Sequence, residues 1–352
     1  MIYFLLFIYI YLYLFIIRIK SENKVKFIVY FFPISTLLVL ILGLQYNVGT
    51  DYFSYLHLAS GNSGLKFITN HYEYLFAFLV RFVRYFKEPQ LIFLFSAIIQ
   101  ISFFTLIVYE LKKMKFKLHI FFFLYFTLML IFFNQFNGIR QYISVYIIIY
   151  ALFKLINSKK IIFITLVFLA SLFHISSLIF LIFLILNPLL KMKFSKYKII
   201  IIICSFILIS LYDFSNIYIK IIKYLPFYNN YIHSTYFGRL SLQGIITKIP
   251  KLIIVISSIY FIDHSKLSKK ETYLINLSYI SIITLVMSFT STLIWRFYHY
   301  LDFFLIIPVL LLFHNKKYKK LRLLFGLILL FMFITKVILI PRGEYLYRWI
   351  IF

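Results

Sequence analysis

Charged residues, acidic ones above all, are scarce in this chain, and so is cysteine. Charged side chains make up 13% of the 352 residues and only 10 residues are Asp or Glu, which excludes a soluble globular protein of ordinary composition. The single cysteine, Cys204, lies in an apolar run, so an intrachain disulfide is excluded. Paired carboxylates and His-rich clusters with metal-ligand spacing are also missing, and we expect neither a metal ion nor a cofactor.

Apolar residues, by contrast, are abundant. They make up 63% of the chain and the mean hydropathy is +0.97, as expected for an integral membrane protein that crosses the bilayer many times. The formal net charge of +27 would suggest nucleic acid as the partner of a soluble protein. Here the lysines lie in short clusters between membrane-length runs, where they orient the chain and contact anionic lipid heads. We therefore expect membrane lipid as a partner, and no nucleic acid.

Apolar runs near the length of a spanning helix, about 20 residues, recur along the chain. The run at 1–17 lacks a basic segment before it and a small-residue cleavage site, which favours a retained helix over a signal peptide. The candidate spans are 1–17, 27–44, 90–110, 118–133, 139–156, 199–212, 245–262, 272–292, 297–313 and 323–340.

The apolar block 161–190 is too long for one untilted helix and too short for two complete ones. If it crosses the membrane once, the lysine clusters before and after it lie on opposite faces, against the positive-inside rule. We therefore predict a hairpin of two short helices, 161–173 and 175–190, which meet at His174 near the outer face. All six basic clusters then lie on one side, namely 18–26, 112–117, 154–160, 191–198, 264–270 and 315–322.

The predicted fold is thus all-α, a polytopic integral membrane protein with about 12 membrane segments. We expect one transmembrane domain over 1–352, both termini outside, and long outer loops at 45–89 and 213–244. The arginines follow the opposite pattern to the lysines. Seven of the nine fall on or near the outer face, which predicts an anionic ligand there: Arg81, Arg84, Arg140, Arg239, Arg296, Arg342 and Arg348.

Two polar groups fall in the first half of the chain, on the predicted outer face. The first is Gly49, Thr50, Asp51 and Tyr52, followed by Tyr55 and Glu73; it is typical of a loop turn, or of carboxylates that touch a sugar or accept a proton. The second is Asn137, Gly138, Ile139, Arg140 and Gln141, where Asn137 is a candidate N-cap. Arginine at a helix start opposes the macrodipole, which favours an anion such as phosphate, or lipid phosphate as the simpler alternative.

Two more groups follow. His174 lies between Phe173 and Ser176 at the turn of the predicted hairpin, where it either bonds a neighbouring helix or lines a functional cavity. The last group runs from Trp295 to Asp302 and contains Arg296, His299 and Tyr300. Asp302 lies inside a predicted span and needs a partner, for which His299 at i, i+3 is nearest in sequence. Arg239, Lys248 and Lys251 add positive charge to the same face.

In their order these groups resemble the EpsG family, the Wzy-like polysaccharide polymerases, over about residues 40–310. The resemblance rests on the Gly49 to Tyr52 segment with Tyr55, then Glu73, Asn137 with Arg140 and Gln141, Phe173 and His174 with Ser176, and Arg296 with Tyr300. The chain departs from the family pattern at 45–47, where an arginine is usual, and after Glu73, where Tyr74 and Leu75 replace a proline and a glycine.

The resemblance implies a membrane glycosyltransferase that polymerises lipid-linked oligosaccharide repeat units into capsular, exopolysaccharide or O-antigen chains. Its substrate would be a polyprenyl-diphosphate-linked oligosaccharide at the outer face of the cytoplasmic membrane, with a chain-length regulator and a flippase as partner proteins. We expect Arg140, Arg296 and Arg239 to bind the diphosphate, and Tyr52, Gln141 and Tyr300 to contact substrate. His174 is the expected base, with Asp51 and Glu73 as alternatives. The competing functions are a flippase or transporter of lipid-linked sugars and an O-antigen-type ligase.

Overall fold

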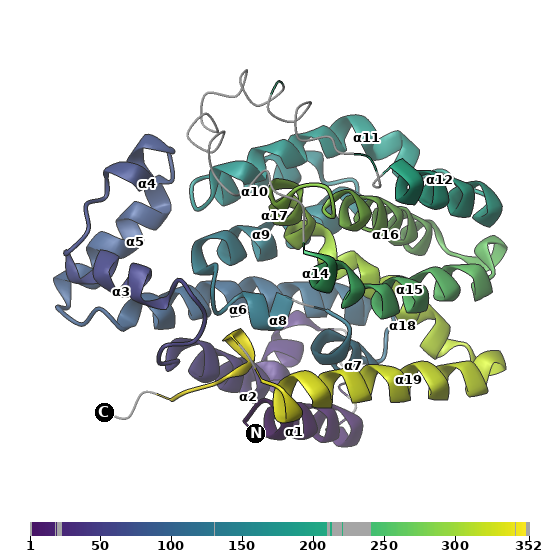
Figure 1. The fold of residues 1–352 in the computed structure, drawn as a ribbon, viewed down its shortest axis with the longest axis horizontal. Helices are drawn as coiled ribbons and strands as arrows, with labels where there is room; N and C mark the ends of the chain where they lie inside the picture. Colours follow the sequence, from purple (N-terminus) through teal and green to yellow (C-terminus); the bar gives the residue numbers. More distant parts are fainter. Residues whose placement is uncertain are drawn as a thin grey trace. The chain divides into compact units, whose positions relative to one another are not determined.

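The computed structural model describes residues 2–17, 19, 23–129, 131–209, 212, 220, 241–341 and 343–349. Every element of regular structure in these ranges is helical, which confirms the all-α prediction. The chain divides into two compact units. Unit 1 is formed by 1–184 and 326–352, and unit 2 by 185–325. Figure 1 shows the elements in chain order.

Unit 1 contains most of the polar groups that the sequence singles out. Unit 1 shares two helices with unit 2, because the boundary falls within α11, which is grouped with unit 1, and within α19, which is grouped with unit 2. Its elements are α1 (Ile2–Ile17), α2 (Lys24–Gly43), α3 (Tyr52–Ser60), α4 (Lys66–Asn70), α5 (Tyr74–Tyr85), α6 (Leu91–Lys113), α7 (Leu118–Thr127), α8 (Ile131–Asn134), α9 (Ile139–Ile156), α10 (Lys160–Ser171), η1 (Ile175–Leu181), α11 (Ile182–Leu190), η7 (Thr335–Leu339) and η8 (Gly343–Tyr345).

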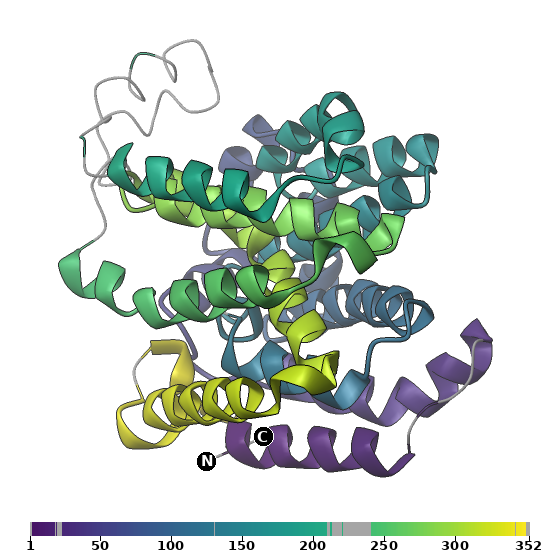
Figure 2. The same cartoon turned by 90° about the vertical axis from the view of Figure 1, so that its right-hand side faces the viewer.

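Unit 2 contains the second half of the polytopic chain. In it α12 and α16 lie side by side, as do α16 and α17 (Figure 2). Its elements are α12 (Lys196–Ile209), α14 (Leu242–Ile246), α15 (Ile249–Phe261), η4 (His264–Lys266), α16 (Lys269–Met287), α17 (Thr292–Leu301), η5 (Asp302–Leu305), α18 (Ile306–His314), η6 (Lys316–Tyr318) and α19 (Lys319–Ile334).

Six helical segments in the described residues are long and apolar enough to cross a membrane, and four shorter apolar helices accompany them. With α12 and α16 they match the segments predicted from the sequence. Some boundaries differ. The segment predicted at 297–313 begins at Thr292 and is interrupted by the 3₁₀ turn η5, while α7 ends at Thr127 rather than 133.

The turn of the predicted hairpin is present in unit 1, and the last residues of the hairpin, 185–190, belong to unit 2. The helix α10 ends at Ser171, His174 is extended at φ −153° and ψ 112°, and η1 then packs back against α10. The 3₁₀ helix η1 follows this reversal and leads into α11. Each of the helices α10 and α11 is too short to span a bilayer, as the length of the block predicts.

Helix directions in unit 1 separate lysines from the polar groups. Ser35 contacts Thr105 across α2 and α6, which are antiparallel, and Ser144 bonds Ala170 across α9 and α10. One end of these helices is defined by Glu110, which pairs with Lys113 at 2.5 Å and with Lys154 at 2.7 Å; we call it the lysine end of unit 1. The opposite end carries Glu73, Arg140 and His174. The two lysines paired with Glu110 and the guanidinium of Arg140 therefore lie at opposite ends of unit 1.

The segment 45–89, predicted as an outer loop, contains three helices. α3, α4 and α5 stand together (Figure 1), with contacts of both α3 and α4 to α5. Arg84 on α5 donates to the carbonyls of Leu58 and Ser63 and thereby holds the turn after α3. Of the other predicted outer loop, 213–244, only Lys220 and 241–244 lie within the described residues.

Candidate active site

Glu73 is placed at the polar end of unit 1 by backbone bonds between α5 and α10. The amides of Leu75 and Phe76, at the start of α5, both donate to the carbonyl of Leu172, just after α10. Residue 73 therefore lies beside the turn that contains His174. The carboxylate is almost completely buried, with 1% of the residue exposed. A buried carboxylate is stable only when it is paired and hydrogen-bonded.

The two oxygens of Glu73 have different partners. Oε1 lies 2.7 Å from Nδ1 of His174 and also accepts from the backbone amide of Ile175 at 3.2 Å. Oε2 lies 2.5 Å from Nη1 of Arg140. The latter contact is an ion pair whose N–H direction is not that of an aligned hydrogen bond. One carboxylate thus connects three segments of unit 1: α5, α9 and the hairpin turn.

Arg140 is the second residue of α9, where its charge opposes the helix dipole. Glu73 supplies the compensating charge, which the sequence argument had assigned to an external anion alone. The guanidinium also lies near the rings of Phe67 and Phe76, at 5.8 and 5.9 Å from their centroids. With 19% of its side chain exposed, Arg140 still reaches solvent beyond the pair. It combines a fixed position with access for a ligand.

The charge state of Glu73 follows from its surroundings. Burial acts to raise its pKa, but the His174 hydrogen bond, the charges of His174 and Arg140, and the Ile175 amide outweigh burial and lower the pKa below 4.5. Glu73 is therefore a carboxylate at neutral pH. Such an ionised, buried carboxylate orients an imidazole and stabilises its protonated form.

Asn137 brings the Gly49 to Tyr52 segment to the same end of unit 1. Its Oδ1 accepts from the amide of Asp51 at 2.8 Å and from the hydroxyl of Thr50 at 3.2 Å. The predicted N-cap role of Asn137 is wrong, because the N-cap of α9 is Gly138. Gly49 has φ +79°, and a Cβ there would lie 2.9 Å from Oδ1 of Asn137, so both its backbone and its packing favour glycine.

The two tyrosines of this segment are held in the protein. Tyr52 is 1% exposed, stacks on Phe93 and donates its hydroxyl to Gln90 at 2.7 Å. Tyr55 lies near Arg140, and its burial raises the pKa of its phenol to about 12. Neither phenol ionises near neutral pH. The predicted contact of Tyr52 with substrate stays a prediction, and its hydroxyl has a structural partner.

Unit 2 contains a separate charged group, around Asp302 at the end of α17. Asp302 is completely buried and is contacted by Lys251 and by the hydroxyl of Tyr298. The sequence suggested only His299 as its partner. The sequence assigned Lys251 to the same face but did not pair it with Asp302, because the two are 51 residues apart in the chain. Lys248 lies 4.4 Å from the ring of Trp295.

The remaining predicted residues divide between the units. Gln141 follows Arg140 on α9 and is partly exposed, whereas Arg296 and Tyr300 belong to unit 2, where Tyr300 is completely buried. Arg239 lies outside the described residues. The roles predicted for these residues stay predictions. Within the described ranges, no three His, Cys, Asp or Glu side chains gather in a group that would hold a metal ion.

Comparison with known proteins gives one match. The family model of the EpsG family covers residues 28–349, nearly the whole chain. No curated protein and no solved structure matches. The match includes every residue of the Glu73, Arg140 and His174 group and of the Asp302 group. This chain therefore belongs to the EpsG family, whose general role is of the polysaccharide polymerase type.

Proposed function

We propose that this protein is a membrane glycosyltransferase that extends a polysaccharide by transfer from a polyprenyl-diphosphate-linked donor. The observation that carries the proposal is the division of the Glu73 carboxylate between His174 and Arg140. One buried carboxylate contacts both His174, which we propose as the base, and Arg140, which we propose as the residue that binds the diphosphate. The membership in the EpsG family supports the polymerase type of reaction.

The proposed step is a displacement at the anomeric carbon of the donor sugar. The acceptor hydroxyl loses its proton to Nε2 of His174 as its oxygen bonds to that carbon. The bond from the carbon to the diphosphate oxygen breaks, and the diphosphate leaves with the electron pair. Glu73 holds Nδ1 of His174 and stabilises the imidazolium, so among the three candidate bases we assign His174 to proton transfer and Glu73 to positioning.

Arg140 stabilises the negative charge that develops on the diphosphate leaving group. The planar guanidinium carries five N–H donors, so one can stay with Glu73 while others bind phosphate oxygens. Donors fixed before the reaction stabilise developing charge without reorganisation, and removing one of them costs about 10²–10³ in rate in known enzymes. The rings of Phe67 and Phe76 hold the guanidinium plane in place.

The decisive variant is Arg140→Lys, which keeps the positive charge and loses the fork. We expect a loss of long-chain polymer of at least about a hundredfold with unchanged membrane abundance. The matched control is Arg81→Lys on α5, an exposed arginine, which should polymerise normally. Normal long-chain polymer in Arg140→Lys would contradict the assignment.

The competing functions are separated by the glycans of a deletion strain. A polymerase defect leaves single repeat units at the surface. Loss of a flippase traps lipid-linked intermediates on the inner leaflet, and loss of a ligase leaves long unattached chains. Either of the last two results would overturn the proposal.

A further inference from the structure

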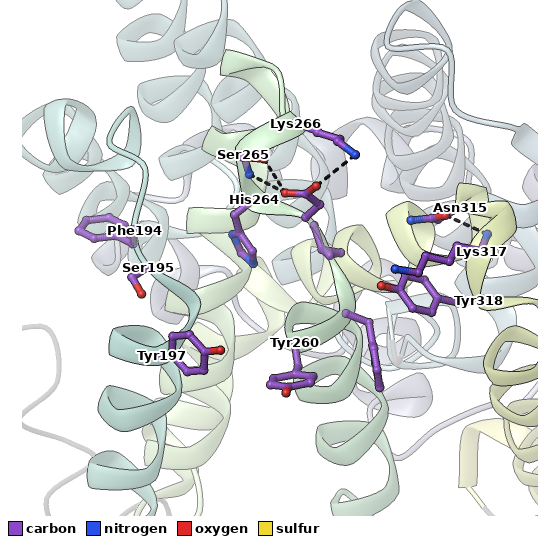
Figure 3. A pocket seen from close by; sticks show the side chains of 13 residues that line it. Phe194, Ser195, Tyr197, Tyr260, His264, Ser265, Lys266, Asn315, Lys317 and Tyr318 are labelled. Atoms are coloured by element: carbon purple, nitrogen blue, oxygen red, sulfur yellow. Dashed lines mark hydrogen bonds and ion pairs between the residues drawn. The ribbon is translucent and has the colours of Figure 1, made fainter.

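A cavity of unit 2 lies away from the Asp302 group. Its volume is about 600 Å³, and it opens among three loops that are distant in sequence: 194–197, 260–266 and 315–318. Figure 3 shows Lys266 and Lys317 at its edge and Tyr197, Tyr260 and Tyr318 along its walls. The three basic clusters of unit 2 thus meet around a single hollow.

Packing within unit 2 joins these loops. Lys193 donates to the carbonyl of Ser265 at 3.1 Å, which connects the segment before α12 to η4. The ring of Phe261 lies 5.3 Å from that of Tyr318, which connects the end of α15 to η6. The cavity is therefore a defined feature of the packed unit, at the ends of its membrane-length helices.

The charge balance of the cavity favours an anion. Asp263 is its one carboxylate, and its partners are the amide and hydroxyl of Ser265, with Lys266 at 3.3 Å. These hydrogen bonds lower the pKa of Asp263, so it is ionised and balances one lysine. The charge of Lys193 meets a neutral carbonyl, and Lys317 lies over the ring of Tyr318. Of the two lysines that line the cavity, Lys266 is balanced by Asp263, so Lys317 remains as net positive charge.

From this geometry we infer that the cavity binds the phosphate headgroup of an anionic membrane lipid. The lysines provide the charge, and the tyrosine and phenylalanine rings provide the amphipathic wall that suits the boundary between headgroups and acyl chains. Basic pockets between membrane helices bind anionic headgroups in this way. A soluble phosphate compound has the same charge, but it would gain nothing from the aromatic wall. This site is independent of the proposed glycosyl transfer.

The test uses the full chain in detergent, with bound lipid counted by native mass spectrometry. Phosphatidylglycerol or cardiolipin should be retained and phosphatidylcholine should not. The double variant Lys266→Gln with Lys317→Gln should lose at least about tenfold of the anionic lipid. The control Lys159→Gln with Lys160→Gln removes two exposed lysines from unit 1 and should change retention less than twofold. Equal losses in the two double variants would overturn the inference.

Two further measurements use the unmodified protein and therefore do not depend on whether a variant folds. A photoactivatable phosphatidylglycerol on the unmodified protein should label peptides containing 260–266 and 315–318 more than the basic peptide 112–117. Equal labelling of all three would reject a specific pocket. Inorganic phosphate at millimolar concentration should not displace the lipid. Complete displacement would reject the lipid in favour of a soluble phosphate compound.

Discussion

The structure makes a quantitative prediction for Glu73→Gln, a change that keeps shape and removes charge. The amide oxygen can still accept from His174 and Ile175, but its NH₂ group then faces Nη1 of Arg140, which lies 2.5 Å from Oε2 in the native protein. Removing one member of a buried ion pair costs about 3–5 kcal/mol. Because Arg140 is 19% exposed, water offsets part of that cost, and we expect about 2–3 kcal/mol.

A shift of this size is measurable by thermal unfolding of the detergent-solubilised full chain. At about 2 °C per kcal/mol for a chain of this length, the apparent melting temperature should fall by roughly 5 °C. Combining Glu73→Gln with Arg140→Gln should recover much of the loss, because no unpaired charge then remains, and the cycle should give a coupling of about 1–3 kcal/mol. An unchanged melting temperature for Glu73→Gln would refute the pairing.

Three other predictions follow from the same structure. The pKa of Glu73 is lowered on folding, so its contribution to stability is complete above pH 4.5 and is lost as the pH falls through its folded value; acid unfolding of Glu73→Gln should lack this component. Lys251→Met should destabilise the chain by about 3–5 kcal/mol because the buried Asp302 loses the other member of its ion pair, and adding Asp302→Asn should restore stability in a thermal melt. Gly49→Ala should lower polymer yield, since φ +79° and Asn137 both oppose a Cβ; a yield equal to that of Gly64→Ala, an open position without a positive φ, would contradict this.

The sequence identified the residues of the candidate site but not the contacts between them. Residue type and position identified Glu73, Arg140 and His174 separately, because ionisable groups near apolar runs are costly and therefore conspicuous. Sequence could not rank Asp51 against Glu73. In the fold, Glu73 is bonded to His174 although the two are 101 residues apart, whereas the carboxylate of Asp51 accepts from the hydroxyl of its neighbour Thr50.

The prediction for Asp302 is incomplete for a related reason. A buried charge has to be paired, and the sequence correctly demanded a partner. Helical spacing offered His299 as the nearest candidate, but Lys251 comes from α15, a different helix that packs against α18. Which helices are neighbours depends on the shapes of whole apolar faces, and spacing along one helix contains no information about that.

The sequence by itself determined the membrane class, the helical segments, the hairpin at 161–190 and the separation of lysine from arginine. These depend on transfer free energies and segment lengths, which are local properties of the chain. Only the tertiary structure decided that Glu73 joins Arg140 to His174, that Lys251 pairs with Asp302, and that three lysine clusters of unit 2 surround one cavity. Such contacts join residues on different helices, and their distances are set by how the helices pack.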